Sequence, residues 1–369
     1  MAMPELFART IEHYLAPIRP YLEDSSVTEV MVNAPDEIYV EQDGRLELTP
    51  AKFDDRELYE AAVNNILQYT GKSLADDRAL VDARLPDGSR VHVAKSPCAR
   101  RGTVMSIRKF SRMMLDIDWL IELGSLTTEA RDFLRVAVMA EQNVLVAGGT
   151  SSGKTSLLNA MSAFIPASER IVVIEDSAEL QLQREHVVSL ESKPADAFGR
   201  GAVGVRELFR SSLRLRPDRI IIGEVRGGEA LDMIQAMTSG HGGSMGTLHA
   251  NTPADALNRL ETMALMSKVE LPLHALRSQV SSAIDLVVQM SRQIGGRRLV
   301  THISEVLPLG DQSYYQLRDI FTMKQIDDES GGKAMWLSWT GTPSVLAGRL
   351  DPDQQRAVTP AIRAVVGLD

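Results

Sequence analysis

The stretch NVLVAGGTSSGKTSLLNAM, residues 143–161, decides the fold of the second half of this chain. An apolar run leads into the pattern Gly148-x-x-x-x-Gly153-Lys154-Thr155, and an apolar-periodic helix follows it. Glycines in such a loop let backbone N–H groups turn inward around phosphates, and the following helix points its positive end at them. The lysine reaches the β- and γ-phosphates, and the threonine hydroxyl ligates magnesium.

This loop therefore predicts a nucleotide-binding site, with ATP and Mg²⁺ as the expected cofactors. A chance glycine turn is the alternative, and the flanking strand and helix disfavour it. The predicted nucleotide-binding residues are Gly148, Gly149, Thr150, Ser151, Ser152, Gly153, Lys154, Thr155 and Ser156.

Strands alternate with helices from residue 125 to about residue 300, which is typical of a parallel sheet wrapped by helices. The expected strands are Asn143–Ala147, Ile171–Glu175, Arg219–Ile222 and Ser244–Ala250. The expected helices are Thr128–Gln142, Lys154–Phe164, Val205–Leu215, Glu229–Thr238 and one that starts after Thr252.

The regions before and after residues 125–300 have a different pattern of strands and helices. Residues 1–124 combine short strands with one helix, Asp55–Thr70, capped by Asp54, and predict a small α+β domain. Residues 125–300 form the expected ATPase domain, and residues 301–369 a short extension of strands that ends in a helix near Gln354–Val366. A turn is expected at Asp43-Gly44 and a polar loop at Asp327–Gly332.

Composition limits the class of protein. The 369 residues suit two domains, and 44% hydrophobic with 24% charged residues is ordinary for a soluble globular protein. A net charge of −9 provides no overall electrostatic attraction to nucleic acid, so no nucleic-acid partner is expected. The single Cys98 fits a reducing compartment, and no apolar run is long enough for a signal or a spanning helix. We therefore expect a cytoplasmic protein whose membrane role is peripheral.

Carboxylates follow the second expected strand. Glu175, Asp176 and Glu179 stand where a parallel strand delivers its carboxyl end to the ligand crevice. One of them is expected to orient or deprotonate the attacking water, and another to hold magnesium through water. A solvated acidic loop is the alternative for any such triplet seen alone.

The stretch RIIIGEVR, Arg219–Arg226, brings Glu224 to the same edge. This glutamate is expected near the γ-phosphate or the outer sphere of magnesium, and Gly223 is expected to leave room beside the phosphate loop. Arg226 is expected to bridge Glu224 to a neighbouring group. The alternative is a helix-capping acid, because a helix begins near Glu229.

Two histidines, His241 and His249, lie in a glycine-rich segment. His249 ends a strand, where histidines often have a structural role. The alternative is that it senses the γ-phosphate and passes its presence to the helix after Thr252, and His241 and Arg226 are further candidate sensors. A metal site is disfavoured, because neither cysteine nor ligand spacing accompanies them.

Four boxes in this order resemble the secretion and pilus motor ATPases of type II secretion, type IV pili and type IV secretion: GGTSSGKT, EDSAE, IIGEVR and GTLHAN. The resemblance implies a RecA-like domain behind the α+β domain, with Glu179 and Glu224 as catalytic acids. It also implies roles for Lys154 and His249 in catalysis. Which glutamate takes the proton stays open.

Finer features resemble one branch. MSIRKF, Met105–Phe110, and the C-terminal stretches THISEVLPL and YYQLRDIFTM are similar to CpaF-like ATPases of tight-adherence pili. Type IV secretion traffic ATPases share the compact two-domain plan and remain the rival. The four-cysteine zinc insert of many type II secretion ATPases is absent from the sequence.

The resemblance further implies a homohexamer that works on an inner-membrane platform protein, with first-domain arginines on the nucleotide. Arg108 and then Arg101 are the candidates. Arg206, Arg210 and Arg214 share one helix face and are expected to be a solvated stripe. A nucleotide-gated scaffold with little turnover is the rival from another class, and the Glu179–Glu224 pair disfavours it. A DNA translocase is disfavoured by the net charge.

Overall fold

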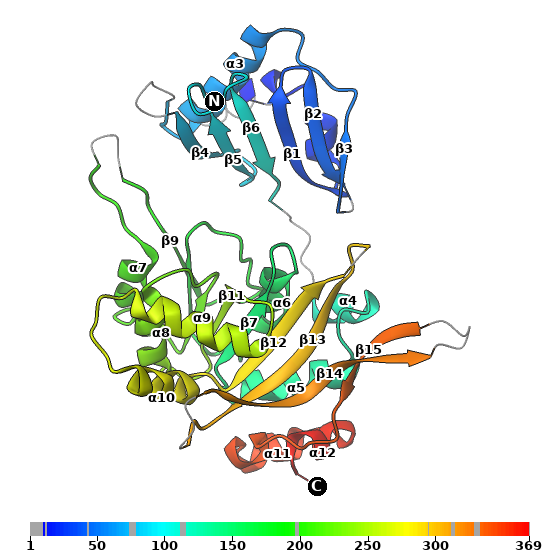
Figure 1. Cartoon of the computed structure of the whole chain (residues 1–369), viewed down its shortest axis with the longest axis vertical. Helices are drawn as coiled ribbons and strands as arrows, with labels where there is room; N and C mark the ends of the chain where they lie inside the picture. The colour runs from blue at the N-terminus through cyan, green and yellow to red at the C-terminus, as the bar shows by residue number, and fades with distance from the viewer. Residues whose placement is uncertain are drawn as a thin grey trace. The chain divides into compact units, whose positions relative to one another are not determined.

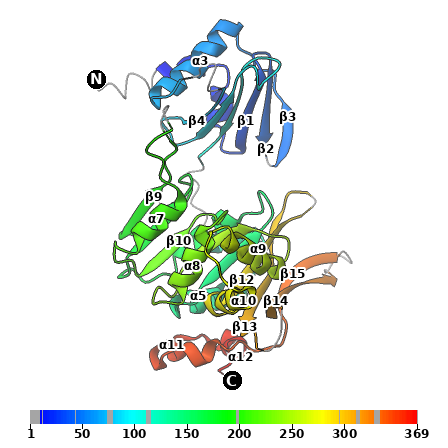
Figure 2. The ribbon, with the colours of Figure 1, turned by 60° about the vertical axis from the view of Figure 1, so that its left-hand side comes forward.

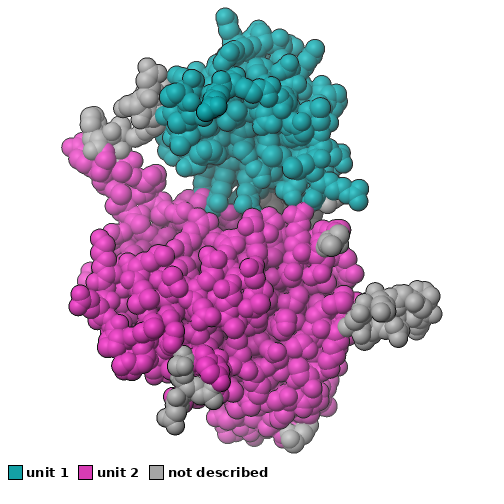
Figure 3. Space-filling view, viewed as in Figure 1, with its two compact units in different colours: residues 1–114 teal, residues 115–369 magenta. Residues whose placement is uncertain are grey.

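The computed structural model describes residues 10–368, apart from residues 12, 43, 74–78, 111–115, 196–198, 294, 311–313 and 328–332. The chain divides into two compact units, residues 1–114 and residues 115–369, each with its own sheet (Figures 1 and 3). The expected Asp43-Gly44 turn and Asp327–Gly332 loop fall partly outside the described residues.

The first unit is built around a six-stranded antiparallel sheet with the order β3-β2-β1-β6-β5-β4. Buried and accessible residues alternate along β5 and β6, as in a sheet with one covered face. The expected small α+β domain is confirmed. Its elements are α2 Arg19–Glu23, β1 Val27–Ala34, β2 Glu37–Gln42, β3 Arg45–Leu48, α3 Arg56–Tyr69, β4 Leu80–Arg84, β5 Arg90–Ala94 and β6 Val104–Arg108.

Helix α3 supplies much of the first core, burying Tyr59, Val63 and Ile66 against the sheet. It begins one residue later than the sequence indicated. The cap is Asp55 rather than Asp54, because the Asp55 carboxylate accepts a hydrogen bond from the Leu58 N–H at 2.7 Å.

The second unit holds a nine-stranded sheet with the order β15-β14-β13-β12-β7-β11-β10-β8-β9. The strands from β12 to β9 run parallel, which confirms the expected parallel sheet. The sequence analysis missed β9 and β12. The parallel strands are β7 Val144–Gly148, β8 Ile171–Glu175, β9 Val187–Glu191, β10 Arg219–Ile222, β11 Met245–His249 and β12 Leu286–Arg292.

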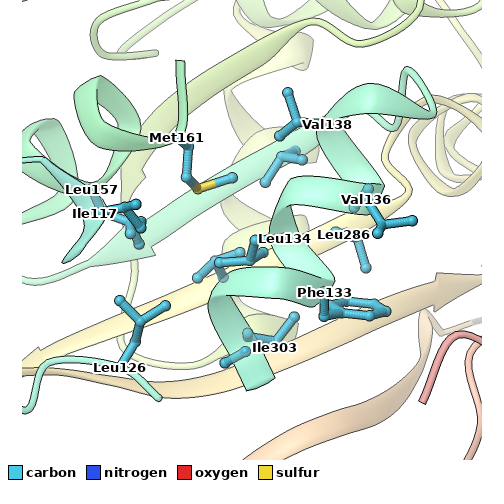
Figure 4. Close-up of a cluster of buried hydrophobic side chains, with 14 of the residues drawn as sticks. Ile117, Leu126, Phe133, Leu134, Val136, Val138, Leu157, Met161, Leu286 and Ile303 are labelled. Carbon is cyan, nitrogen blue, oxygen red and sulfur yellow. The ribbon is translucent and has the colours of Figure 1, made fainter. Parts of the chain in front are cut away.

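Helices cover both faces of these strands. Val144 and Val146 of β7 join a core with α5 and α6, and Leu145 and Ala147 join a second core with α8, α9 and α10, because successive strand residues point to opposite faces (Figures 2 and 4). No helix in the described ranges is both long and apolar enough to cross a membrane. The helices are α4 Ile117–Glu122, α5 Thr128–Met139, α6 Lys154–Ser162, α7 Val205–Ser212, α8 Glu229–Met237, α9 Pro253–Leu265 and α10 Leu273–Ala283. Helix α10 was not predicted.

The C-terminal residues continue this sheet instead of forming a separate extension. The antiparallel strands β13 Arg298–Leu307, β14 Gln316–Asp327 and β15 Lys333–Trp339 follow β12. Ile303, Phe321 and Val366 pack in the same core as α5, so burial joins residues 301–369 to the rest of the second unit. The expected final helix is split, since Pro360 disfavours helix at the residue before it. The last elements are η1 Leu346–Arg349, α11 Pro352–Ala357, η2 Pro360–Ile362 and α12 Arg363–Val366.

The division between the units also differs from the expectation. It falls after Met114, ten residues before the expected boundary at Gly124. The reason is helix α4, whose Ile117 and Leu120 are buried in the core of the second unit together with Leu157 of α6.

A close backbone approach fixes helix α8 behind the site. A Cβ on Gly228, the residue before α8, would lie 2.9 Å from Ser267 Cα and 3.1 Å from Ser267 N. Backbone atoms move aside less readily than the end of a long side chain, so only glycine fits here.

We expect Gly228→Ala to lower the free energy of unfolding by about 1–3 kcal/mol through overpacking. The matched control is Gly348→Ala, because a Cβ on Gly348 meets nothing within 4 Å. Thermal and denaturant unfolding of both variants measure the difference. Equal stabilities would contradict the packing argument.

Candidate functional site

The phosphate loop joins β7 to α6 and requires glycine at its first position. A Cβ on Gly148 would lie 2.4 Å from Ser152 Oγ and 2.6 Å from the Met290 carbonyl oxygen of β12. Gly153 has φ of 96°, in the left-handed region that favours glycine. The predicted nucleotide-binding residues from Gly148 to Ser156 thus form one continuous loop and first helical turn.

Lys154 is buried at the start of α6. Its Nζ donates a hydrogen bond to the Gly149 carbonyl at 2.9 Å and lies 3.5 Å from His249 Nδ1. The ammonium therefore stays inside the loop, where the phosphates of a nucleotide would bind.

His249, the last residue of β11, connects Lys154 to Glu224. Its Nε2 lies 2.9 Å from Glu224 Oε1. Burial, with Lys154 as the next cause, lowers the pKa of His249 below its ordinary value, although Glu224 opposes this. The neutral imidazole fits both contacts: an Nε2–H faces the Glu224 carboxylate, and the Nδ1 lone pair faces the ammonium of Lys154.

Arg226 bridges two carboxylates, as the sequence indicated. Its Nη2 donates to Glu224 Oε2 at 2.6 Å, and its Nη1 lies 3.5 Å from Asp176 Oδ2. The side chain is 60% exposed, so this bridge contributes little to stability and leaves Arg226 open to a ligand.

Glu175 explains the glycine in RIIIGEVR. This carboxylate is 5% exposed, and its Oε1 accepts hydrogen bonds from the Glu179 and Leu180 N–H groups at 2.9 and 3.1 Å. A Cβ on Gly223 would lie 2.8 Å from Glu175 Cγ. The expected room beside the phosphate loop is therefore wrong: Gly223 makes room for Glu175, which shapes the turn carrying Glu179.

The site fits a magnesium–nucleotide complex better than a metal held by protein alone. The described residues contain no group of three or more His, Cys, Asp or Glu that could hold a metal. Magnesium usually keeps several waters and takes substrate phosphates together with one or two protein oxygens. Thr155 lies in the first turn of α6. Glu175 ends β8, Asp176 follows it, and Glu224 lies two residues after β10, the neighbour of β8.

Sequence reasoning missed the residues that β12 and β13 bring to the loop. Arg298 Nε donates to the Ser151 carbonyl at 3.1 Å. Gln289, Met290, Ser291 and Arg292 line a pocket of about 210 Å³ beside Gly149 and Thr150. The apolar run before Gln289 was a strand signal, but nothing local to it points to phosphates.

Three predicted residues do not join this group within the described second unit. His241 precedes β11 and packs near the amino end of the sheet, whereas the phosphate loop follows the carboxyl end of β7. Strand β11 separates His241 from His249 within this chain, and a sensor role for His241 stays a prediction. Arg108 is exposed at the end of β6, and Arg101 pairs with Glu37 at 2.8 Å, both in the first unit.

The expected stripe on α7 is also partly wrong. Arg206 and Arg210 donate to the two oxygens of Asp232 at 2.6 and 2.9 Å, so this face packs on α8. Arg214 lies beyond the end of α7.

Comparison with known proteins identifies related secretion-system proteins. The family described as "Type II/IV secretion system protein" matches residues 12–318. The putative conjugal transfer protein Rv3659c of Mycobacterium tuberculosis is 34% identical over 78% of this chain and 83% of its own. The type IV secretion system protein PtlH of Bordetella pertussis is 35% identical over 80% and 94%.

Among solved structures, the ATPase DotB of Yersinia pseudotuberculosis is similar in fold, with a TM-score of 0.58 and 17% identity over 84% of this chain and 81% of that one. With a family match over most of its length and relatives above 30% identity, the chain belongs to the type II/IV secretion system protein family.

Proposed function

We propose that this chain hydrolyses Mg–ATP and powers transport through a type IV secretion system. The Lys154–His249–Glu224 contacts carry the proposal, because they hold an ammonium, a neutral imidazole and a carboxylate together at the phosphate loop. Phosphoryl transfer depends mainly on such positioning and charge stabilisation.

The side chains divide the work. Lys154 binds the β- and γ-phosphates, and either Glu224 or Glu179 orients the attacking water and accepts its proton. His249 links the two and responds to the γ-phosphate. Magnesium would neutralise charge on the phosphates, with Thr155 as direct ligand and Glu175, Asp176 or Glu224 acting through water.

The relatives favour type IV secretion over the tight-adherence pilus function that the finer sequence features suggested. Two compared relatives are named for conjugal transfer and type IV secretion. We further propose a homohexamer in the cytoplasm that contacts an inner-membrane platform protein. Arg108 and Arg101 remain predicted nucleotide contacts.

We expect Lys154→Ala to lower the rate of hydrolysis at least about a hundredfold and to weaken ATP binding, because the main cation for the phosphates is lost. Phosphate release and equilibrium binding of labelled ATP measure both effects. Transport in the native host should fail with Lys154→Ala and recover with the wild-type chain. Unchanged turnover would contradict a phosphate role for Lys154.

We expect Glu224→Gln to bind ATP normally and to hydrolyse it about 10²–10⁴-fold more slowly, because the neutral amide accepts no proton and its single oxygen can face only one of His249 and Arg226. The matched control is Glu270→Gln, an exposed glutamate outside the site. Normal turnover in Glu224→Gln would leave Glu179 as the base. Negligible turnover in the wild-type chain itself would favour the nucleotide-gated scaffold.

We expect the hydrolysis rate to be level where His249 is neutral and to fall only below the ordinary titration range of a histidine, because burial and Lys154 lower the pKa of His249. Protonation fills Nδ1 and places a second positive charge beside Lys154. The pH–rate profile measures this effect. In His249→Gln the rate should be lower but the acid limb due to His249 should disappear, and an identical acid limb would exclude His249 as its source.

A further inference from the structure

Gln289 of β12 contacts the residue that follows His249 at the end of β11. The side chain is 3% exposed, and its Nε2 donates to the Ala250 carbonyl at 3.0 Å and to the Met290 carbonyl at 3.3 Å. Both partners are acceptors, so the orientation of the amide is fixed: a flipped amide would place oxygen against oxygen.

The other end of this amide lacks a partner. Among the described residues nothing donates a hydrogen bond to Gln289 Oε1, although the oxygen is shielded from bulk water. A buried acceptor left unsatisfied costs free energy, so a native site usually supplies a donor. Gln289 lines the pocket beside Gly149 and Thr150, and a donor would come from there.

The chemistry of the oxygen limits what the donor is. Phosphate oxygens of ATP are acceptors at neutral pH, so they make no hydrogen bond to another acceptor. The donors that remain are the adenine amino group of the nucleotide and the O–H groups of an ordered water or a ribose. The adenine lies farthest from the phosphates in ATP, so a pocket beside Gly149 and Thr150 favours an ordered water or a ribose hydroxyl. Both would lie next to the phosphate loop.

The donor end of the amide acts on the catalytic residues through the backbone. Ala250 follows His249 directly, and the Ala250 N–H donates to the Gly148 carbonyl at 3.4 Å. Gln289 therefore holds the end of β11, which carries His249, against the first residue of the loop. We propose that Gln289 is a positioning residue for ATP hydrolysis: it fixes the end of β11 through Ala250 and accepts a hydrogen bond from an O–H group in this pocket.

This inference rests on the proposed function, so the experiment begins with hydrolysis by the full-length wild-type chain. The test variant is Gln289→Met, which keeps the length of the side chain and removes both hydrogen-bonding groups; Gln289→Asn is a second, smaller change. The matched control is Gln279→Met of α10, because Gln279 Oε1 is also buried without a partner but lines a different pocket, between α8 and α10. ATP, 2′-deoxy-ATP and 3′-deoxy-ATP are the substrates.

We expect Gln289→Met to lower kcat about tenfold and to change KM by less than about threefold, because phosphate binding through Lys154 is retained. Gln279→Met should hydrolyse ATP like the wild type. If a ribose hydroxyl is the donor, the wild type hydrolyses the matching deoxy substrate more slowly than ATP. Gln289→Met then hydrolyses that substrate and ATP at the same rate. If water is the donor, the wild type hydrolyses all three alike.

Several results would overturn the inference while leaving the proposed function intact. One is a Gln289→Met kcat within twofold of the wild type, and another is a loss confined to KM. If Gln289→Met does not fold, the same criteria apply to Gln289→Asn. A wild-type chain that does not hydrolyse ATP would instead remove the proposed function itself.

Discussion

The charge contact between His249 and Glu224, with Lys154 on the other side of the same imidazole, is the interaction on which the site depends. It exists because β7, β11 and β10 are parallel neighbours whose carboxyl ends meet at one edge. Register is decisive: His249 pairs with Gly148, and a slip by one residue would turn the histidine to the other face. Buried apolar residues on both faces hold that register.

Close backbone approaches support the same edge. Gly148 lets β12 and Ser152 come near the loop, Gly223 admits the buried Glu175, and Gly228 lets α8 pack on the turn after α9. None of the three has positive φ, so each glycine serves the approach of a neighbouring group rather than a left-handed turn. The absence of a side chain at these three glycines therefore shapes the site together with the charged side chains around them.

The imidazole of His249 lies between two charged side chains of the site. It separates the ammonium of Lys154 from Glu224, and Arg226 takes the other oxygen of that carboxylate. Lys154 also donates to the Gly149 carbonyl, which keeps its ammonium within the loop.

The sequence by itself determined the phosphate loop, the parallel strands around it and the placing of Glu175, Glu224 and His249 at strand ends, because glycine spacing and hydrophobic periodicity are local signals. Only the tertiary structure decided that Gly223 lies against Glu175, that β11 separates His241 from His249, and that Gln289 binds the Ala250 carbonyl. It also joined residues 301–369 to the main sheet and moved the division between the units to Met114. These features depend on contacts between residues far apart in the chain, and no periodicity within one segment records which distant segment will pack against it.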